Sequence, residues 1–508
     1  MNTDRQHHRA AITGVAALGL SLATASLAAA VLKVDGPVNL VGNRFIDSTP
    51  KWLKTWAIDA FGTADKAVLK LGVFVVLCLV AAGIGAASMK RRSLGLVGTA
   101  ALTAVGLLAA VTRSGRQSAD WLALALGGLV GAGALWVASK PPASGPSESP
   151  VAYDRRRFIV SGAAMVGGAG VLGLAGSAVR RSATHVTAKA RSVLQLPTPR
   201  SPAPAVAATA DVGNGVSPYI TPTADFYRID TALSIPNIDA ALWNLKVSGM
   251  VERPTTLTYA DILTMPMVER LVTLSCVSND VGGDLVGNAI WLGVPLADIL
   301  NSVGVKPGAT QLASKSVDGW TCGFPTALAL DGRNALLAVG MNGEPLTPLH
   351  GYPCRLVIPG IYGYVSATKW LSDIMLTTFE DFDGYWIDKG WAKEGPIKTQ
   401  SRIDVPRRGN PLVAGPIPVA GVAWAVHRGI SKVEVRIDKG PWNQARLADE
   451  PTVDGWRQWI YEWNATAGKH TLQVRATDGL GVTQTETIAR SDPDGATGWH
   501  TVGVTIAA

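Results

Sequence analysis

The chain has 508 residues, and 46 Lys and Arg against 38 Asp and Glu give it a formal net charge of +8. Only 17% of the residues are charged, 47% are hydrophobic and the mean hydropathy is +0.21, which excludes a disordered or collagen-like chain. The length allows about two to four domains. Four dispersed cysteines without a C-x-x-C pair predict neither a disulfide framework nor a zinc site.

Hydrophobic residues concentrate in the first 180 positions, where they form five long apolar runs. Each run is about 20 residues long, which is enough to cross the hydrocarbon core of a bilayer as a helix. We therefore predict an all-α transmembrane bundle over residues 1–180; buried helices of a soluble core are the alternative. The runs are 10–32, 67–88, 94–112, 121–138 and 158–178.

The basic residues of the short connecting loops predict the orientation of the bundle. Arg5 and Arg9, the run 90–92 and the triplet 155–157 fall on one side if all five runs span the membrane, and positive charge favours the cytoplasmic side. The chain after Ala178 then lies outside. We expect a multi-pass protein of the cell membrane whose larger part is extracytoplasmic.

The arginine triplet has a second interpretation. Arg155, Arg156 and Arg157 precede Phe158 and a Gly/Ala-rich apolar run, an arrangement that resembles a twin-arginine export signal placed internally. A positively charged anchor for the fifth helix explains the same residues, so the sequence leaves both readings open.

Beyond the apolar runs, the sequence divides into three parts. Residues 181–224 are rich in proline, which predicts an extended linker. Residues 225–403 mix short strands with helical stretches at 259–264 and 292–303, which is typical of an α+β domain. Residues 404–508 contain alternating strands separated by turns, which predicts an all-β, immunoglobulin-like sandwich without the usual disulfide.

Cys276 is the residue most suggestive of chemistry. An apolar strand leads directly to it, and Gly282, Gly283 and Gly287 follow, so a ligand can approach the thiol closely. On composition alone, a buried, inert cysteine is the favoured interpretation. A Cys-His nucleophile would need a base nearby, and the sequence does not place His350 beside the thiol.

Two sequence blocks then narrow the alternatives. The first runs from Cys276-Val277-Ser278-Asn279 to Trp291-Leu292-Gly293-Val294-Pro295, and the second from Asn342-Gly343-Glu344-Pro345 to Lys369-Trp370-Leu371. Together they resemble the molybdenum-binding core of the sulfite-oxidase family. The last part of the chain, with Gly498-Trp499-His500, is similar to the dimerisation domain of that family.

The resemblance implies a cofactor, molybdenum held by molybdopterin, and a role for each matching residue. Cys276 would be the thiolate ligand of the metal, which suits a soft sulfur donor. Cationic side chains would hold the phosphate of the pterin. The implied cofactor-binding residues are Tyr227, Arg228, Asp318, His350, Arg355, Ala367, Thr368 and Lys369.

The sequence also departs from the family. Asp280 and Val281 stand where sulfite oxidases have paired arginines, and Trp320 stands at the position of an active-site tyrosine. The resemblance implies two-electron oxygen-atom transfer on a small substrate. We also expect a separate cytochrome or quinone-linked electron partner and a possible homodimer, and we expect no nucleic-acid partner. A sulfoxide reductase of this family and a cofactor-free extracytoplasmic binding or scaffold protein are the alternatives.

Overall fold

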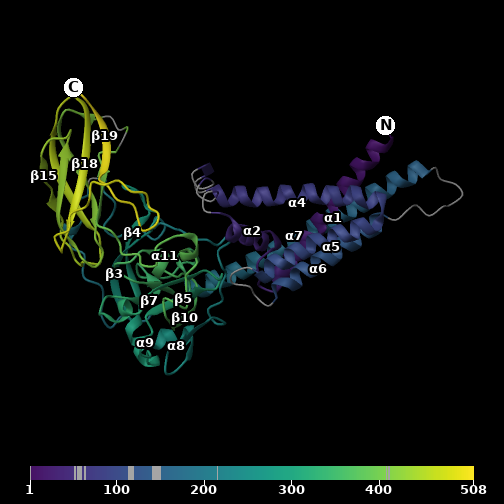
Figure 1. Cartoon of the computed structure of the whole chain (residues 1–508), viewed down its shortest axis with the longest axis horizontal. Coiled ribbons are helices and arrows are strands. Elements are labelled where there is room, and N and C mark those ends of the chain that lie inside the picture. The colour runs from purple at the N-terminus through teal and green to yellow at the C-terminus, as the bar shows by residue number, and fades with distance from the viewer. Residues whose placement is uncertain are drawn as a thin grey trace. The chain divides into compact units, whose positions relative to one another are not determined.

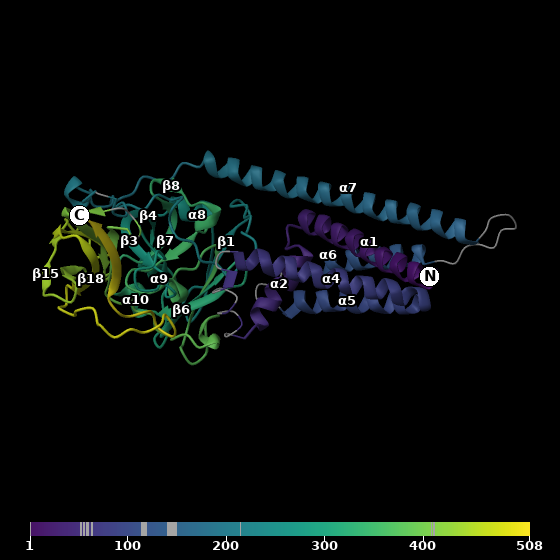
Figure 2. The same cartoon turned by 90° about the horizontal axis from the view of Figure 1, so that it is seen from above.

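The computed structural model describes residues 2–50, 53, 56, 60–61, 64–112, 119–139, 150–213, 215–407, 409 and 412–508. The chain forms two compact units, which Figures 1 and 2 show in two views. The first contains Met1–Lys189 together with Thr231–Asn237, and the second contains Ala190–Asp230 and Ile238–Ala508. Residues 231–237 belong to the first unit because Lys66 and Lys70 of that unit donate to the carbonyls of Ala232 and Leu233 at 2.9 and 2.8 Å.

The first unit is helical. Its helices are α1 (Asn2–Val31), α2 (Pro37–Ser48), α4 (Asp65–Lys90), α5 (Arg92–Thr112), α6 (Asp120–Ala138) and α7 (Pro150–Ser192). Five of them are long and apolar enough to cross a membrane, and each covers most or all of one predicted run. The last of these continues well beyond residue 178, so residues 181–192 are helical rather than part of a linker.

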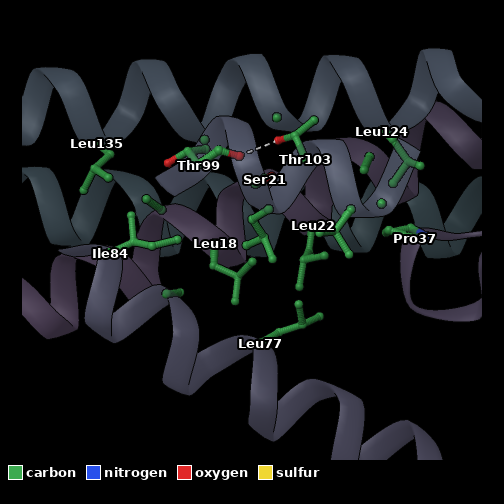
Figure 3. Close-up of a pocket in the computed structure, with 18 of the residues that line it drawn as sticks. Leu18, Ser21, Leu22, Pro37, Leu77, Ile84, Thr99, Thr103, Leu124 and Leu135 are labelled. Carbon is green, nitrogen blue, oxygen red and sulfur yellow. Dashed lines mark hydrogen bonds between the residues drawn. The ribbon is translucent and has the colours of Figure 1, made fainter. Parts of the chain in front are cut away.

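Small residues allow these helices to approach one another closely. A Cβ on Gly14 of α1 would lie 2.1 Å from the carbonyl oxygen of Ala81 in α4, so only glycine fits there. An apolar pocket between α1, α2, α4, α5 and α6 is lined by leucines such as Leu18 and Leu77 (Figure 3). The Thr103 hydroxyl at this pocket donates to the carbonyl of Thr99 at 2.8 Å, within its own helix.

The central part of the second unit is α+β and contains two sheets. One sheet has the order β2-β1-β10-β5-β6, and the other has the order β3-β4-β7-β8 with β9 paired to β7. The strands are β1 (Asn244–Gly249), β2 (Thr255–Thr258), β3 (Val268–Ser275), β4 (Val286–Pro295), β5 (Gln311–Ser316), β6 (Thr321–Pro325), β7 (Leu336–Met341), β8 (Glu344–Pro345), β9 (Arg355–Val357) and β10 (Leu371–Thr377).

Short helices lie before, between and after these strands. They are η2 (Ala208–Ala210), α8 (Tyr259–Thr264), α9 (Leu296–Val303), α10 (Ala327–Leu330), η3 (Pro348–His350), α11 (Gly363–Ser366) and η4 (Ile387–Lys389). The predicted helix at 259–264 is confirmed, and a capping box between Thr258 and Asp261 begins it. The helix predicted over 292–303 was wrong in its first four residues, because Leu292 and its neighbours extend β4 and pair with β7.

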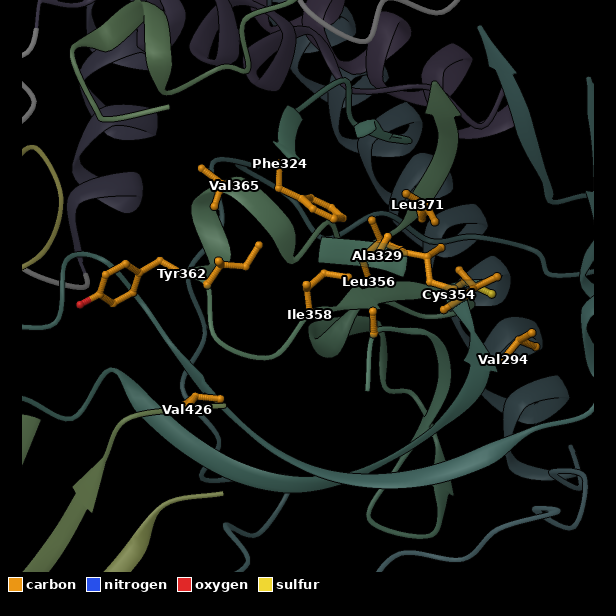
Figure 4. Close-up of a cluster of buried hydrophobic side chains, with 14 of the residues drawn as sticks. Val294, Phe324, Ala329, Cys354, Leu356, Ile358, Tyr362, Val365, Leu371 and Val426 are labelled. Atoms are coloured by element: carbon orange, nitrogen blue, oxygen red, sulfur yellow. The ribbon is translucent and has the colours of Figure 1, made fainter. Parts of the chain in front are cut away.

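The hydrophobic core of the central domain lies between these elements. Phe324, Leu356, Ile358 and Leu371 are completely buried in it, and Figure 4 shows them with Tyr362 and Val365 of the segment around α11. Burying a leucine or phenylalanine side chain contributes about 1.5–3 kcal/mol. The core therefore fixes the positions of the strands, and the ends of these strands carry the candidate site.

The C-terminal part is a sandwich of two sheets with its own core, in which Val419, Val433, Trp459 and Leu472 are completely buried. It begins with β11, whose Gln400 pairs with Trp424, four residues before the predicted boundary. The strands are β11 (Gln400–Val405), β12 (Leu412–Val413), β13 (Gly415–Trp424), β14 (Ile430–Ile437), β15 (Trp442–Gln444), β16 (Arg446–Leu447), β17 (Arg457–Ala465), β18 (Gly468–Asp478) and β19 (His500–Ala507).

The proline-rich segment 200–224 belongs to the second unit and packs against the rest of it, in contrast to the extended linker predicted for it. Arg200 donates its backbone N–H to Met267 at 2.8 Å, and Tyr219 is only 2% exposed. The Tyr219 carbonyl accepts hydrogen bonds from the side chains of Asn288 and Trp456, each at 2.9 Å. Apolar residues between the prolines gain free energy from burial, which favours an attached segment over a free one.

Candidate active site

Cys276 lies immediately after β3, at the edge of its sheet. The apolar strand before it is buried, and the cysteine itself is 9% exposed. Its backbone N–H donates to the carbonyl of Leu285 at 2.9 Å, which closes the loop between β3 and β4. Burial raises the pKa of the thiol, while hydrogen bonds from Ser278 and the charge of Lys369 act in the opposite direction. The thiol therefore keeps its proton until a cation or metal competes for the sulfur.

Arg355, at the start of β9, is a buried cation. It is 5% exposed and its guanidinium lies over the ring of Trp291, 4.9 Å from the ring centroid. Its Nε and Nη1 donate to the carbonyls of Leu356 and His350 at 3.3 Å each. Burial lowers the pKa of Arg355 to about 10. No carboxylate forms an ion pair with it within the described part of the chain, so the charge is incompletely balanced.

His350, at the end of η3, is neutral and oriented. It is 4% exposed, and its Nε2 lies 2.9 Å from the carbonyl oxygen of Thr223. Because a carbonyl oxygen only accepts, Nε2 must carry the proton and Nδ1 is left as an acceptor. Burial lowers the pKa of His350 to about 4, so the imidazole is uncharged at neutral pH.

Lys369 is anchored by a carboxylate that the sequence analysis did not single out. Its Nζ pairs with Asp230, whose side chain is fully buried, and donates to the carbonyl of Ile229 at 3.0 Å. Arg228 lies on the other side of Asp230, with Nε 3.0 Å from Oδ2, and its side chain is 44% exposed. Burial lowers the pKa of Lys369 to about 8, although Asp230 opposes the shift. Lys369 therefore remains mostly charged at neutral pH.

The other expected residues lie around these groups. Tyr227 is half-buried and stacks on Phe226; burial raises its pKa, the charge of Cys276 adds to the rise and the charge of Arg355 opposes it. Asp318, between β5 and β6, accepts the backbone N–H of Trp320 at 3.2 Å, and burial raises its pKa. The charges of Asp230 and Lys369 also act on Asp318, so it belongs to the same electrostatic neighbourhood.

The turn after α11 is held from inside the domain. Thr368 is completely buried, and its hydroxyl lies 2.7 Å from the Ser314 hydroxyl and 3.1 Å from the sulfur of Cys322. Ala367 donates its backbone N–H to Gly363 at 2.9 Å. The Thr368 side chain thus fixes the turn that presents Lys369, while its own hydroxyl is already bonded within the protein.

Tyr362 lies within electrostatic range of the Cys276 thiol, and the sequence analysis missed it. It is 2% exposed, and burial raises its pKa to about 12, with a contribution from the charge of Cys276. Gly363, the next residue, would place a Cβ 4.0 Å from the carbonyl oxygen of Ser275. The only signal in the sequence is its position inside the second sequence block, which runs from Asn342 to Leu371.

Comparison with known proteins relates the part of the chain that carries this site to other sequences. A model of the oxidoreductase molybdopterin binding domain matches residues 232–386. Oxidoreductase YuiH of Bacillus subtilis is 38% identical over 157 residues, which are 31% of this chain and 76% of YuiH. Human mitochondrial sulfite oxidase is 29% identical over 322 residues, which cover 53% of this chain and 58% of that protein.

A solved structure shares the fold. The sulfane dehydrogenase SoxCD of Paracoccus pantotrophus superimposes with a TM-score of 0.51 at 22% identity, covering 59% of this chain and 86% of that chain. Residues 232–386 contain Cys276, Asp318, His350, Arg355 and Lys369, whereas Tyr227 and Arg228 precede the matched range.

The donors in the site fit an anionic, hydrogen-bonding group such as a molybdopterin. Arg355 makes only two long hydrogen bonds to carbonyls and retains further N–H donors. Lys369 adds a second cation, and Nδ1 of His350 is an acceptor. A buried thiol stands in the same electrostatic neighbourhood. Two cations, one acceptor and one soft sulfur match the phosphate, the ring N–H groups and the metal of such a cofactor.

Proposed function

Since this chain belongs to the sulfite-oxidase-type family of molybdopterin-dependent oxidoreductases, we propose that it catalyses two-electron oxygen-atom transfer on a small substrate. The protein is an oxidoreductase whose cofactor is molybdenum held by molybdopterin. Bound at the site, this cofactor supplies the oxygen-atom transfer and the change of metal oxidation state. The chain supplies binding, orientation and electrostatics.

The observation that carries this proposal is that the charge of the buried Lys369 acts on the Cys276 thiol and that the charge of Arg355 acts on Lys369, so the three groups share one electrostatic neighbourhood. Cys276 would bind the metal through Sγ and lose its proton on coordination. Arg355 and Lys369 would hold the pterin phosphate by charge-assisted hydrogen bonds. His350, kept neutral by burial, would accept a hydrogen bond from the pterin through Nδ1. Tyr227, Arg228, Asp318, Ala367 and Thr368 would complete the wall of the cofactor site.

Elemental analysis tests the proposal. We would purify the full chain from a host that makes molybdopterin and measure molybdenum by elemental mass spectrometry, beside Cys276→Ser and the matched variant Cys354→Ser. Cys354 is a suitable control because it is also a free, buried thiol. About one metal per chain in the wild type and in Cys354→Ser, with altered metal spectra in Cys276→Ser, is expected. A folded, cofactor-supplied chain without metal would overturn the proposal.

Sulfoxide reduction is the second candidate, and the acidic loop after Cys276 favours it. Asp280 and Asp284 are exposed on this loop, and Asp280 stands at a position where sulfite oxidases have arginine. A carboxylate repels an oxyanion, whereas a neutral sulfoxide meets no such penalty. Steady-state rates with sulfite, nitrate and methyl sulfoxides, measured for the wild type and Asp280→Asn, distinguish the two. The family relationship leaves no support for the cofactor-free binding protein.

We further propose that five helices anchor the catalytic part at the outer face of the cell membrane. Their length and their exposed apolar side chains support this: Leu79, Leu129 and Leu174 are 68%, 71% and 72% exposed. Alkaline phosphatase, which is active only outside the cytoplasm, would be fused after Ala508 and, as a control, after Lys90. Activity in the first fusion only is expected; the reverse pattern would contradict the orientation.

A variant of the arginine triplet tests whether the triplet is an export signal or a positively charged anchor of the fifth helix. Replacing Arg156 and Arg157 by lysine keeps the positive charge that orients the fifth helix, but removes the twin arginines. If the segment is an export signal, the phosphatase fused after Ala508 loses activity in this variant. Unchanged activity would favour the simple anchor.

The assembly around this enzyme is proposed on the family relationship. A cytochrome or quinone-linked protein would exchange electrons with the molybdenum site. The sandwich from residue 404 onward, which we expect to be immunoglobulin-like, would make a homodimer. Analytical ultracentrifugation of the detergent-solubilised chain tests the dimer, and a single-copy mass would contradict it.

A further inference from the structure

The loop that follows Cys276 is closed by its own hydrogen bonds. Leu285 and Cys276 are joined through the backbone, and the N–H of Asn279 donates to the carbonyl of Cys276 at 3.1 Å. The side chain of Asn279, 2% exposed, accepts the N–H of Leu285 at 2.8 Å. The direction of the Cys276 side chain therefore depends on the conformation of the whole loop 276–285.

A side chain from the sandwich contacts this loop. Arg402 of β11 is 8% exposed, and its Nη1 donates to the carbonyl of Gly283 at 2.8 Å. The rest of the guanidinium is held by Asp404, with Nε 2.6 Å from Oδ1, and by the Ser217 hydroxyl at 2.8 Å. A planar guanidinium with three bonded nitrogens has little freedom left, so the Gly283 carbonyl is held in one orientation.

Gly282, the residue before Gly283, lies close to a second residue of the sandwich. Gly282 has a φ of +81°, and a Cβ placed on it would lie 2.2 Å from Cδ2 of His500, at the start of β19. Nδ1 of His500 accepts the backbone N–H of Ile403, the residue next to Arg402, at 3.0 Å. Arg402 of β11 thus holds the carbonyl of Gly283, and His500 of β19, from the other sheet of the sandwich, fills the space beside Gly282.

The sandwich also contacts the strand before Cys276. The N–H of Thr273 in β3 donates to the carbonyl of Asp454 at 2.9 Å, and its hydroxyl accepts the N–H of Trp456 at 2.8 Å. The sandwich thus restrains the chain on both sides of Cys276, at Thr273 and at Gly282 with Gly283.

We propose that Arg402 is a positioning residue: it holds the Gly283 carbonyl and thereby sets the direction in which the Cys276 thiol points into the cofactor site. The inference rests on the proposed role of Cys276 as a metal ligand. It makes the sandwich a structural part of the active site, in addition to any role in dimerisation. Arg402 itself touches neither metal nor substrate and acts through the loop.

The test compares Arg402→Gln and Arg402→Lys with Arg428→Gln in the full chain. Arg428 is a matched control, because it pairs with Asp478 at 3.0 Å and donates to the Ile397 carbonyl at 3.0 Å, away from the Cys276 loop. The readouts are molybdenum content, the electron paramagnetic resonance spectrum of Mo(V), kcat and KM, and hydrogen exchange of residues 276–285 in cofactor-free protein.

We expect Arg402→Gln to keep its fold, to exchange the amides of loop 276–285 faster, to show a shifted Mo(V) spectrum and to lose about tenfold in kcat with little change in KM. Arg402→Lys should recover part of each effect, because the ammonium can still reach the carbonyl, and Arg428→Gln should show none of them. If Arg402→Gln takes up no metal, the rate of amide hydrogen exchange of loop 276–285 in the cofactor-free protein decides whether Arg402 holds the loop.

Wild-type exchange of the loop in Arg402→Gln, or a wild-type Mo(V) spectrum in the loaded variant, would refute the positioning role. Failure of the proposed function is recognised separately, because the wild type would then contain no molybdenum, or Cys276→Ser would leave its metal spectra unchanged, whatever Arg402 does. If Arg402→Gln does not fold, Asp404→Asn, which removes the carboxylate that holds the guanidinium, serves in its place with the same expectations.

Discussion

Replacement of Arg355 by methionine should act in opposite directions on the empty and on the loaded protein. Burial lowers the pKa of Arg355 from 12.5 to about 10, which corresponds to about 3 kcal/mol of destabilisation of the charged form at about 1.4 kcal/mol per tenfold. Methionine keeps most of the stem packing. It loses two hydrogen bonds of 3.3 Å, together about 1 kcal/mol, and the contact with Trp291, about 1 kcal/mol.

The balance favours the variant in the empty protein by about 1 kcal/mol. In the loaded protein the lost charge-assisted hydrogen bonds should cost about 2 kcal/mol of cofactor binding, roughly a thirtyfold weaker retention. Urea unfolding of the full chain, followed by tryptophan fluorescence with and without cofactor, measures both effects. Arg333→Met is the control: Arg333 pairs with Asp331 at 2.7 Å, so its loss should destabilise both forms. A clear destabilisation of empty Arg355→Met would refute the reasoning.

Two further predictions concern stability. Burial lowers the pKa of His350 from 6.5 to about 4, so the unfolded chain binds the extra proton first and the free energy of unfolding should fall by up to about 3 kcal/mol as the pH drops through this window. Urea titrations of the cofactor-free chain between these pH values should show this fall in the free energy of unfolding for the wild type and not for His350→Asn. An equal fall in both proteins would contradict the prediction. Gly282→Ala should cost about 2–4 kcal/mol because its methyl meets the ring of His500, whereas Gly332→Ala, also at positive φ but in open space, should cost about 1 kcal/mol in the same assay. Equal costs would show that the contact with His500 is unimportant.

Much of the fold follows from local sequence patterns. The apolar runs appear as long helices because about 20 consecutive apolar residues have few alternatives to a helix. The runs after residue 404 appear as strands, and in β19 exposed and buried residues alternate because a period of two buries one face of a sheet. Boundaries were less predictable. Leu292 belongs to β4 because its pairing with β7 outweighs the local helical pattern.

The candidate site could be predicted only as a set of residue types. The motif around Cys276 and the cations Arg355 and Lys369 were recognised from the order of residues, which a single chain records. Their states depend on neighbours far apart in the sequence. Burial by several elements keeps His350 neutral, and Asp230 balances a lysine 139 residues away.

The sequence by itself determined which residues are apolar, which can bind a metal and where helices and strands are favoured, because these properties depend on side-chain chemistry and short-range periodicity. Only the tertiary structure decided that segment 200–224 is packed into the second unit, that the charge of Cys276 acts on Tyr362 and that Arg402 contacts the Cys276 loop. Those contacts join residues separated by many positions, and the order of residues contains no local signal for them.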